Sequence, residues 1–113
     1  MWLNQKVVNG IWELSIDGEV DASSSIQVDN AIKETLKNGH YRILINCQKL
    51  KYISSAGLGV FISYLDEIRN NNGAIVFCNM SESVLSVFTI LGLNELVPIV
   101  PTYEVAINIV NVG

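Results

Sequence analysis

The sequence RILIN, residues 42–46, is the stretch that decides the fold. Its central side chains are all apolar, so a strand formed here has no polar face. Continuous apolar runs of this length are typical of strands that are covered on both sides, as in parallel sheets. A second run of the same kind, AIVFC, occupies residues 74–78. Two such strands predict a parallel sheet with helices packed on both faces.

An amphipathic helix is predicted between these two strands. Apolar residues recur there at spacings of three and four, which places them on one helical face: Leu58, Phe61, Ile62, Leu65 and Ile68. The segment NNNG at residues 70–73 ends this helix, because asparagine and glycine tolerate the left-handed backbone of a helix terminus.

Three further helices are predicted from capping signals. Ser24, followed by Gln27, matches the capping box that begins many helices. Ser81 begins another predicted helix, which Gly92 ends, and Thr102 begins the last one. Strand and helix patterns therefore alternate along most of the chain, as expected for parallel strands joined by right-handed crossovers.

The chain opens with two strand patterns, residues 1–8 and 11–17, joined at Asn9-Gly10. Asn-Gly between β-prone runs is the strongest short signal for a hairpin, since both residues accept positive φ. A short last strand is predicted at 97–100. The expected fold is α/β: a mixed, mostly parallel sheet of four to five strands, about four helices and an opening antiparallel hairpin. We expect one domain spanning residues 1–113.

The charge balance excludes two classes of partner. Seven basic and eleven acidic residues give a net charge of −4 among 113 residues. The few basic side chains are scattered, whereas nucleic-acid binding needs a basic stripe, so no direct nucleic-acid binding is expected. Attraction to an anionic membrane surface is not expected either. Neither a signal peptide nor an apolar run of membrane-spanning length is visible, so the protein is expected in the cytoplasm.

The two cysteines and the one histidine give weak grounds for an enzyme. Cys47 and Cys78 lie far apart without CxxC spacing, and we expect reduced thiols in buried strands. Together with His40 they are too few for a recognisable zinc site, and no nucleophile–base arrangement is legible. No metal and no cofactor are therefore expected. A small enzyme or thiol protein is the rival interpretation.

Two loops that follow strands are candidate contact sites, because partners of such sheets usually meet the carboxyl ends of the strands. The first loop spans residues 18–24 and the second spans residues 50–60. Ser54 and Ser55 lie where the second loop becomes a helix, beside the free N–H groups of the first turn. The plain alternative is a helix cap with tight packing and no further role.

Two glycines and two short polar residues complete this candidate surface. Gly57 and Gly59 have no side chains that would obstruct another protein's backbone. Asp21, in the first loop, and Asn46, after the central strand, could orient the two serines. Both residue types are equally typical of ordinary turns, so that alternative stays open.

Five segments together carry a family resemblance: YISSAGLGVF at 52–61, GEVD at 18–21, and residues 43–46, 91–93 and 102–106. In this order they resemble the motifs of the STAS domain family, which includes the anti-sigma-factor antagonists. GEVD resembles that family's Gly-x-[Leu/Val]-Asp, and the last two segments resemble its final helices. The resemblance covers essentially the whole chain and implies the STAS fold.

The resemblance also implies a binding function without catalysis. Antagonists of this family bind a serine-kinase anti-sigma factor and thereby release a sigma factor for transcription. The kinase inactivates the antagonist by phosphorylating a loop serine, and a metal-dependent phosphatase reverses the change. That serine lies two residues before the glycine of the motif. With Gly57 as the anchor, the resemblance therefore assigns Ser55 as the phosphorylated residue.

The chain departs from the family motif at two positions. Ser54 stands where the family often has an acid, which makes it the runner-up acceptor, and Ala56 replaces a hydroxyl residue. The alternative function is a STAS scaffold or adaptor of another bacterial signalling complex, with a loop that is not phosphorylated. The partner-binding residues implied by the resemblance are Asp21, Ser54, Ser55, Ala56, Gly57 and Gly59.

Overall fold

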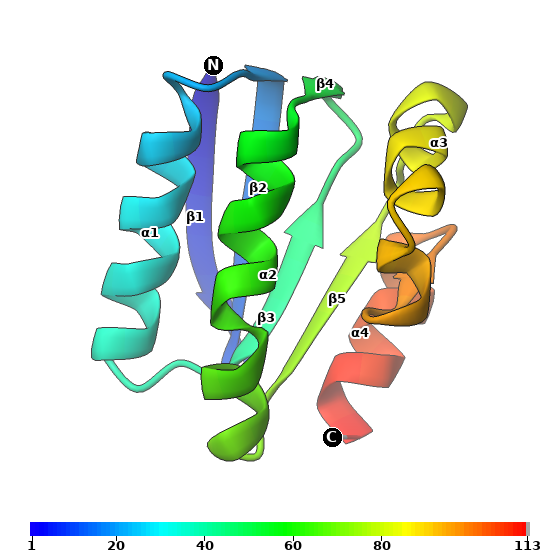
Figure 1. The fold of residues 1–113 in the computed structure, drawn as a ribbon. Coiled ribbons are helices and arrows are strands. Elements are labelled where there is room, and N and C mark those ends of the chain that lie inside the picture. Colours follow the sequence, from blue (N-terminus) through cyan, green and yellow to red (C-terminus); the bar gives the residue numbers. More distant parts are fainter. Residues whose placement is uncertain (113) are drawn as a thin grey trace.

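Six strands and four α-helices form the fold in the computed structural model, which describes residues 1–112 (Figure 1). The first half comprises β1 (Trp2–Val8), β2 (Ile11–Val20), α1 (Ser25–Lys37), β3 (Arg42–Asn46), β4 (Leu50–Ile53) and α2 (Ser55–Asn70). The second half comprises β5 (Ala74–Cys78), α3 (Glu82–Ile90), the 3-10 turn η1 (Leu93–Glu95), β6 (Ile99–Val100) and α4 (Tyr103–Val112).

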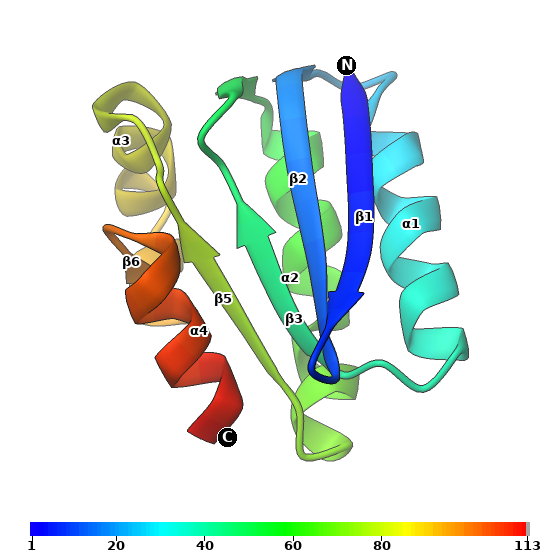
Figure 2. The same cartoon turned by 180° about the vertical axis from the view of Figure 1, so that it is seen from behind.

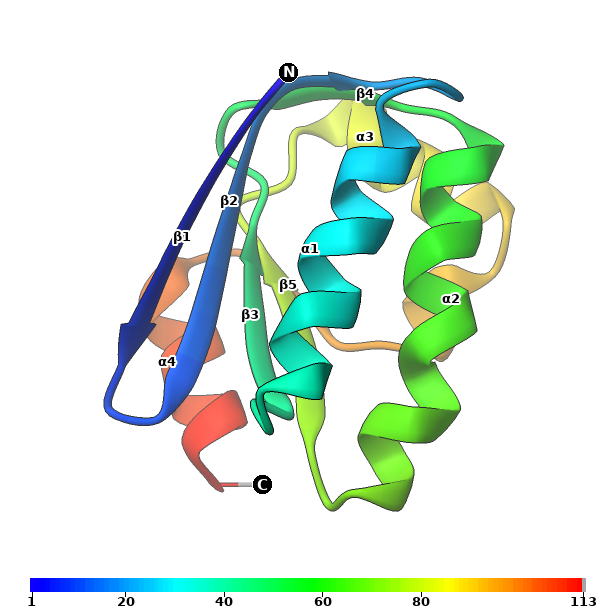
Figure 3. The same cartoon turned by 90° about the vertical axis from the view of Figure 1, so that its left-hand side faces the viewer.

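The sheet follows the order β1-β2-β3-β5-β6, and β4 pairs with β2 outside this path. β1 and β2 form the expected antiparallel hairpin, and the other pairings are parallel. Helices α1 and α2 cover one face of the sheet and α4 covers part of the other, as Figures 2 and 3 show. The predicted fold class is therefore confirmed, because the sheet is mixed, mostly parallel and flanked by helices on both faces.

The strands differ from the prediction in number and in bounds. β1 begins at Trp2 and not at residue 1, and β6 spans Ile99–Val100 where a strand at 97–100 was predicted. The expected sheet of four to five strands has a sixth, β4, within the segment 50–60 that the sequence predicted as a loop. β4 is only four residues long, too short for a periodic signal, and its pairing with β2 and the burial of Leu50 and Ile53 hold it in place. β2 also continues to Val20, beyond its predicted end at residue 17.

A glycine explains the longer β2. Gly18 has φ of +108°, and the register with β4 shifts between Gly18 and Glu19. A glycine in this backbone region allows a bulge that bends a strand without ending it. Gly18, the first residue of the predicted loop 18–24, is therefore the point at which β2 begins to pair with β4.

Two hydrophobic cores lie on opposite faces of the sheet. The larger one lies beneath α1, α2 and α3, where Phe77 contacts Phe61 and Phe88 edge-to-face at centroid distances of 5.0 and 5.3 Å. The smaller one lies beneath α4. Its buried members are Ile11, Leu44, Val76, Cys78, Ala106 and Val110. In the part of the chain that the structure describes, no helix is long and apolar enough to cross a membrane.

Polar contacts hold α4 against the sheet at both of its ends. The Tyr103 hydroxyl donates a hydrogen bond to the carboxylate of Glu13, a residue of β2 that is only 4% exposed. Lys6 Nζ lies 3.4 Å from the other oxygen of that carboxylate. At the far end, the Arg42 guanidinium donates to the carbonyls of Val110 and Asn111 at 3.0 and 3.1 Å. A buried carboxylate thus obtains partners from two other elements.

The contact between Tyr103 and Glu13 predicts a stability effect. Tyr103→Phe should lower the free energy of unfolding by about 1–3 kcal/mol, because it leaves a buried charged acceptor without this donor. Urea denaturation measures the change. The matched control is Tyr52→Phe, since Tyr52 is 48% exposed, and it should stay within about 0.5 kcal/mol of the parent. Equal losses in both variants would contradict this account.

Candidate functional site

The two predicted loops lie side by side at one edge of the sheet. Val20, the last residue of β2, pairs with Ile53, the last residue of β4. One residue further on, the Ser54 amide donates to the Val20 carbonyl at 2.8 Å. Asp21 follows Val20 directly, so the two loops start as neighbours. Helices α1 and α2 begin at this same edge, which Figure 3 shows.

The two adjacent serines have different roles in the structure. Ser54 is the N-cap of α2: its hydroxyl accepts from the Gly57 amide at 3.2 Å, and its carbonyl accepts from the Leu58 amide at 3.0 Å. Ser55 is the first residue of the helix and is exposed. Among the described residues, no hydrogen bond involves the Ser55 hydroxyl. The alternative of an ordinary helix cap therefore applies to Ser54, whereas the hydroxyl of Ser55 is exposed and could react.

The two glycines of the motif also differ. Gly59 is exposed, and a side chain built on it would meet open space. Gly57 is buried, and a Cβ atom there would lie 2.8 Å from Cγ1 of both Val20 and Ile53. The expectation that Gly57 gives access to a partner's backbone is wrong in its physical reason. This glycine lets the first turn of α2 pack directly on the ends of β2 and β4, and exposed Ala56 lies beside it.

Asp21 organises the loop before α1. Its carboxylate accepts from the Ser24 amide at 2.8 Å and from the Ser23 and Ser24 hydroxyls at 2.9 Å each. These hydrogen bonds, above all the one from the Ser24 amide, lower the pKa of Asp21 from 3.8 to about 2. The predicted capping box of Ser24 with Gln27 is wrong, because the Ser24 hydroxyl instead accepts from the Asp21 amide at 2.9 Å.

Asn46 does not orient the serines. Its side-chain oxygen accepts from the Gln48 amide at 3.1 Å and from the Asn79 side-chain amide at 3.2 Å. The first of these bonds spans two residues, which is the pattern of an Asx turn. Of the two alternatives for Asn46, the structure therefore favours the ordinary turn.

The thiols are poorly suited to nucleophilic chemistry. Cys47 and Cys78 are both fully buried and free, although Cys47 lies one residue beyond β3 and not within a strand. Burial raises the pKa of Cys47 strongly and that of Cys78 to about 11, so little thiolate forms at neutral pH. Within residues 1–112, no group of three or more His, Cys, Asp and Glu side chains could hold a metal ion. The rival enzyme interpretation gains no support.

Sequence reasoning missed the exposed side chains of β4. Lys51 and Tyr52 are exposed between buried Leu50 and Ile53, immediately before the two serines. Lys51 also lines a shallow depression with Met1, Glu19 and Asp21, on the surface of the first loop. The sequence signal was the order apolar-polar-polar-apolar, which is too brief to identify a strand by itself.

The charge at the start of α2 favours an added anion. The first turn of α2 contains no acidic residue, whereas the loop before α1 contains the Asp21 carboxylate. The free N–H groups and dipole of a helix start attract negative charge. A negative group on Ser55 would therefore be accepted by α2 without a competing carboxylate in that turn.

Comparisons with known proteins agree with this geometry. The family model described as STAS domain matches residues 3–106. BtrV of Bordetella bronchiseptica, provisionally named an anti-sigma factor antagonist, is 27% identical over 106 residues, covering 94% of this chain and 91% of its own. A Thermotoga maritima structure, provisionally described by the same function, superposes with a TM-score of 0.90 at 23% identity, covering 96% of this chain and 94% of its own. The structure of phosphorylated SpoIIAA of Bacillus superposes with a TM-score of 0.73 at 23% identity, covering 95% of this chain and 97% of its own.

The two glycines give a paired stability prediction. Gly57→Ala should destabilise the protein by about 1–3 kcal/mol, because the new methyl group must displace Val20 and Ile53. Gly59→Ala, which adds a methyl group in open space on the same helix, should stabilise it by about 0.5–1 kcal/mol. Denaturant titration of both variants measures the two changes. The same sign for both would contradict the packing described for Gly57.

The Asp21 carboxylate gives a pH prediction. Its folded-state pKa, about 2, is below its usual value of 3.8, so its stabilising effect is fully present above about pH 4 and disappears as the pH falls through 2. Asp21→Asn should therefore be less stable than the parent at pH 7, and this difference should shrink between pH 4 and pH 2. Thermal melts at several pH values measure it. A difference that does not change with pH would show that the charge is unimportant.

Proposed function

Because this chain belongs to the STAS domain family, we propose that it acts as an anti-sigma factor antagonist. It would be a binding protein without catalytic activity that engages a serine-kinase anti-sigma factor and thereby frees a sigma factor for transcription. The names of its relatives support this class of function. A sigma factor acts on transcription, so we infer that the protein works in the cytoplasm.

One observation carries the proposal: the hydroxyl of Ser55 is exposed and unused at the start of α2, while that of Ser54 caps the helix. A kinase needs an accessible hydroxyl, and this one lies where the ends of β2 and β4 bring both loops together. Ser55 would be phosphorylated by the partner kinase, and a metal-dependent phosphatase would reverse the change. Asp21, Ala56 and Gly59 would border the contact surface.

Electrostatics explains how such a phosphate could act as a switch. A phosphoserine adds about −1.5 to −2 charges at neutral pH. The α2 start tolerates that charge, so the fold of the antagonist would persist. The neighbouring loop already contains the Asp21 carboxylate, which stays ionised because its pKa is about 2. A partner that buries this edge would then have to accommodate two adjacent negative groups, which weakens binding.

A second candidate function is an adaptor whose loop is never phosphorylated. The observation that favours it is Ser54, at a position where the family often has an acid, and the first turn of α2 likewise contains no acid. A kinase that recognises that acid would have less to bind here. The same loops would then form a constant docking surface in a signalling complex.

The switch predicts a difference between the two serines. Incubation with the cognate kinase and ATP should modify Ser55 and not Ser54, read by mass spectrometry of the tryptic peptide. Ser55→Ala should still bind the kinase, because only a hydroxyl is lost. Ser55→Asp should bind about 5- to 150-fold more weakly, the usual range of such couplings. Binding is measured by calorimetry with the purified kinase.

Ser54→Ala is the matched control for this experiment. It removes the cap hydroxyl and should cost about 1 kcal/mol of stability while leaving phosphorylation of Ser55 intact. Phosphate found only on Ser54 would move the site by one residue. Intact kinase binding without phosphate on either serine would refute the switch and support the adaptor.

A further inference from the structure

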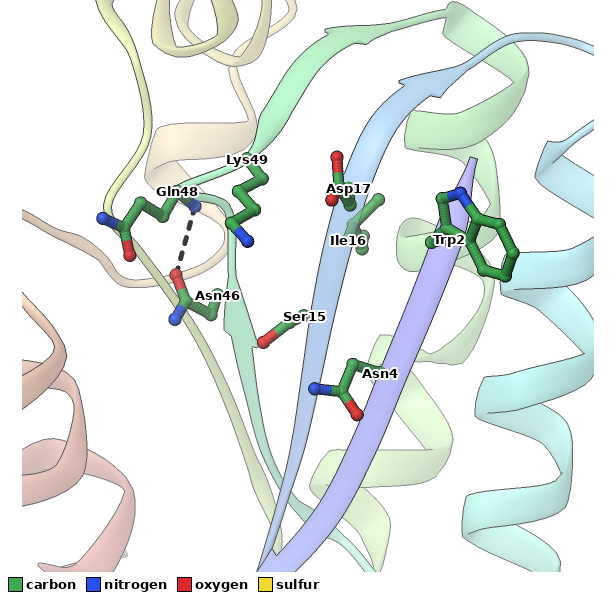
Figure 4. A pocket seen from close by; sticks show the side chains of 8 residues that line it. All are labelled: Trp2, Asn4, Ser15, Ile16, Asp17, Asn46, Gln48 and Lys49. Atoms are coloured by element: carbon green, nitrogen blue, oxygen red, sulfur yellow. Dashed lines mark hydrogen bonds between the residues drawn. The ribbon is translucent and has the colours of Figure 1, made fainter.

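A polar cavity of about 240 Å³ lies on a part of the sheet that α4 leaves uncovered (Figure 4). α4 packs mainly over β3, β5 and β6, so the outer face of β1 and of the end of β2 has no helix above it. The cavity is lined from these strands and from the segment that follows β3. It is distinct from the hydroxyl of Ser55 and does not depend on the proposed function.

The cavity exists because the sheet divides at this point. β2 pairs with β3 only as far as Ser15 and Asn46, and its pairing with β4 starts at Gly18. The segment 47–49, which joins β3 to β4, turns away from the sheet between these two pairings. The Leu50 amide donates to the Cys47 carbonyl across this turn at 3.1 Å. The chain returns where the Gly18 amide donates to the Lys49 carbonyl at 2.9 Å. The excursion leaves an opening beside Asp17.

The register of the strands fixes the polar floor of this opening. Asn4 is paired with Ser15, and Ser15 with Asn46, so three polar side chains form a row on one face. The next row on that face pairs Trp2 with Asp17. Ser15, Asp17 and Asn46 are half-buried. In residues 1–112, the Ser15 hydroxyl and the Asp17 carboxylate have no hydrogen-bond partner within the protein.

The cavity also contains two opposite charges that are not paired with each other. Asp17 and Lys49 both line it, yet among the described residues neither forms an ion pair within 4.0 Å. In Figure 4 the Lys49 side chain runs alongside the segment that follows β3, and the Asp17 carboxylate lies on β2, on the other side of the opening. A purely anionic ligand would be repelled by Asp17, and a purely cationic one by Lys49. A ligand with both charges a few bonds apart would satisfy both side chains.

We propose that this cavity binds a free α-amino acid. Its ammonium group would be held by the Asp17 carboxylate with the Ser15 hydroxyl, and its carboxylate by the Lys49 ammonium with the Asn4 amide. Charge-assisted hydrogen bonds of this kind are the strong ones. Trp2, which is 78% exposed, lines the cavity from β1, and its indole is directed away from the opening in Figure 4.

Isothermal titration of the full chain with each of the twenty standard L-amino acids tests this proposal. At least one should bind saturably with one-to-one stoichiometry. Its N-acetyl derivative lacks the ammonium charge and its amide lacks the carboxylate charge. Each should therefore bind at least about tenfold more weakly than the free amino acid. Absence of saturable binding by every amino acid, or equal affinity for the blocked derivatives, would overturn the proposal.

Variants locate the site. Asp17→Asn and Lys49→Gln should each weaken binding about tenfold or more. Lys51→Gln removes the same charge two positions further along, outside this cavity, and should leave the affinity unchanged. Circular dichroism confirms that all three remain folded. If Lys51→Gln weakens binding as much as Lys49→Gln does, the ligand is held elsewhere and the assignment of this cavity fails.

Discussion

The candidate site depends on the pairing of β4 with the outer end of β2. This short ladder places Ile53 beside Val20 and lets the Ser54 amide bond to the Val20 carbonyl. Since α2 begins one residue later, the position of its first turn is set by the ladder and not by helix propensity. The absence of a side chain at Gly57 completes the arrangement, because any Cβ atom there would meet Val20 and Ile53. One backbone pairing thus fixes two loops and a helix start together.

Adjacent residues divide the structural and the available roles at this edge. Ser54 caps α2 by accepting a hydrogen bond from the Gly57 amide. Asp21 stabilises the loop before α1 by accepting from the Ser23 hydroxyl and the Ser24 amide. None of these contacts uses the hydroxyl of Ser55, which therefore has no structural role among the described residues. A site that is to be modified reversibly benefits from this division, because changing a residue without a structural contact leaves the fold intact.

Sequence reasoning succeeded where the signal was local and long. The strands at 42–46 and 74–78 have the predicted bounds, since a continuous apolar run leaves no alternative to burial. It failed where several partners competed for one group. Ser24 was predicted to cap a helix with its hydroxyl, but that hydroxyl accepts from the Asp21 amide instead, and no pattern in the sequence ranks these contacts. The burial of Gly57 was equally hidden, because it results from a strand of four residues. The polar cavity is lined by residues of three strands, β1, β2 and β3, and only the register of their pairing shows that these residues are neighbours.

The positions of the two thiols allow local unfolding of the two layers of this molecule to be followed separately. Cys47 and Cys78 are joined through the backbone, amide to carbonyl, at 2.9 Å. Their side chains nevertheless belong to different cores, one beneath α1 and α2 and the other beneath α4. They are therefore natural reporters of two separate openings, one for each face of the sheet. Among the described residues, the core beneath α4 has six buried members, fewer than the core of the opposite layer. Local opening of α4 would therefore expose the Cys78 sulfur while Cys47 stays buried.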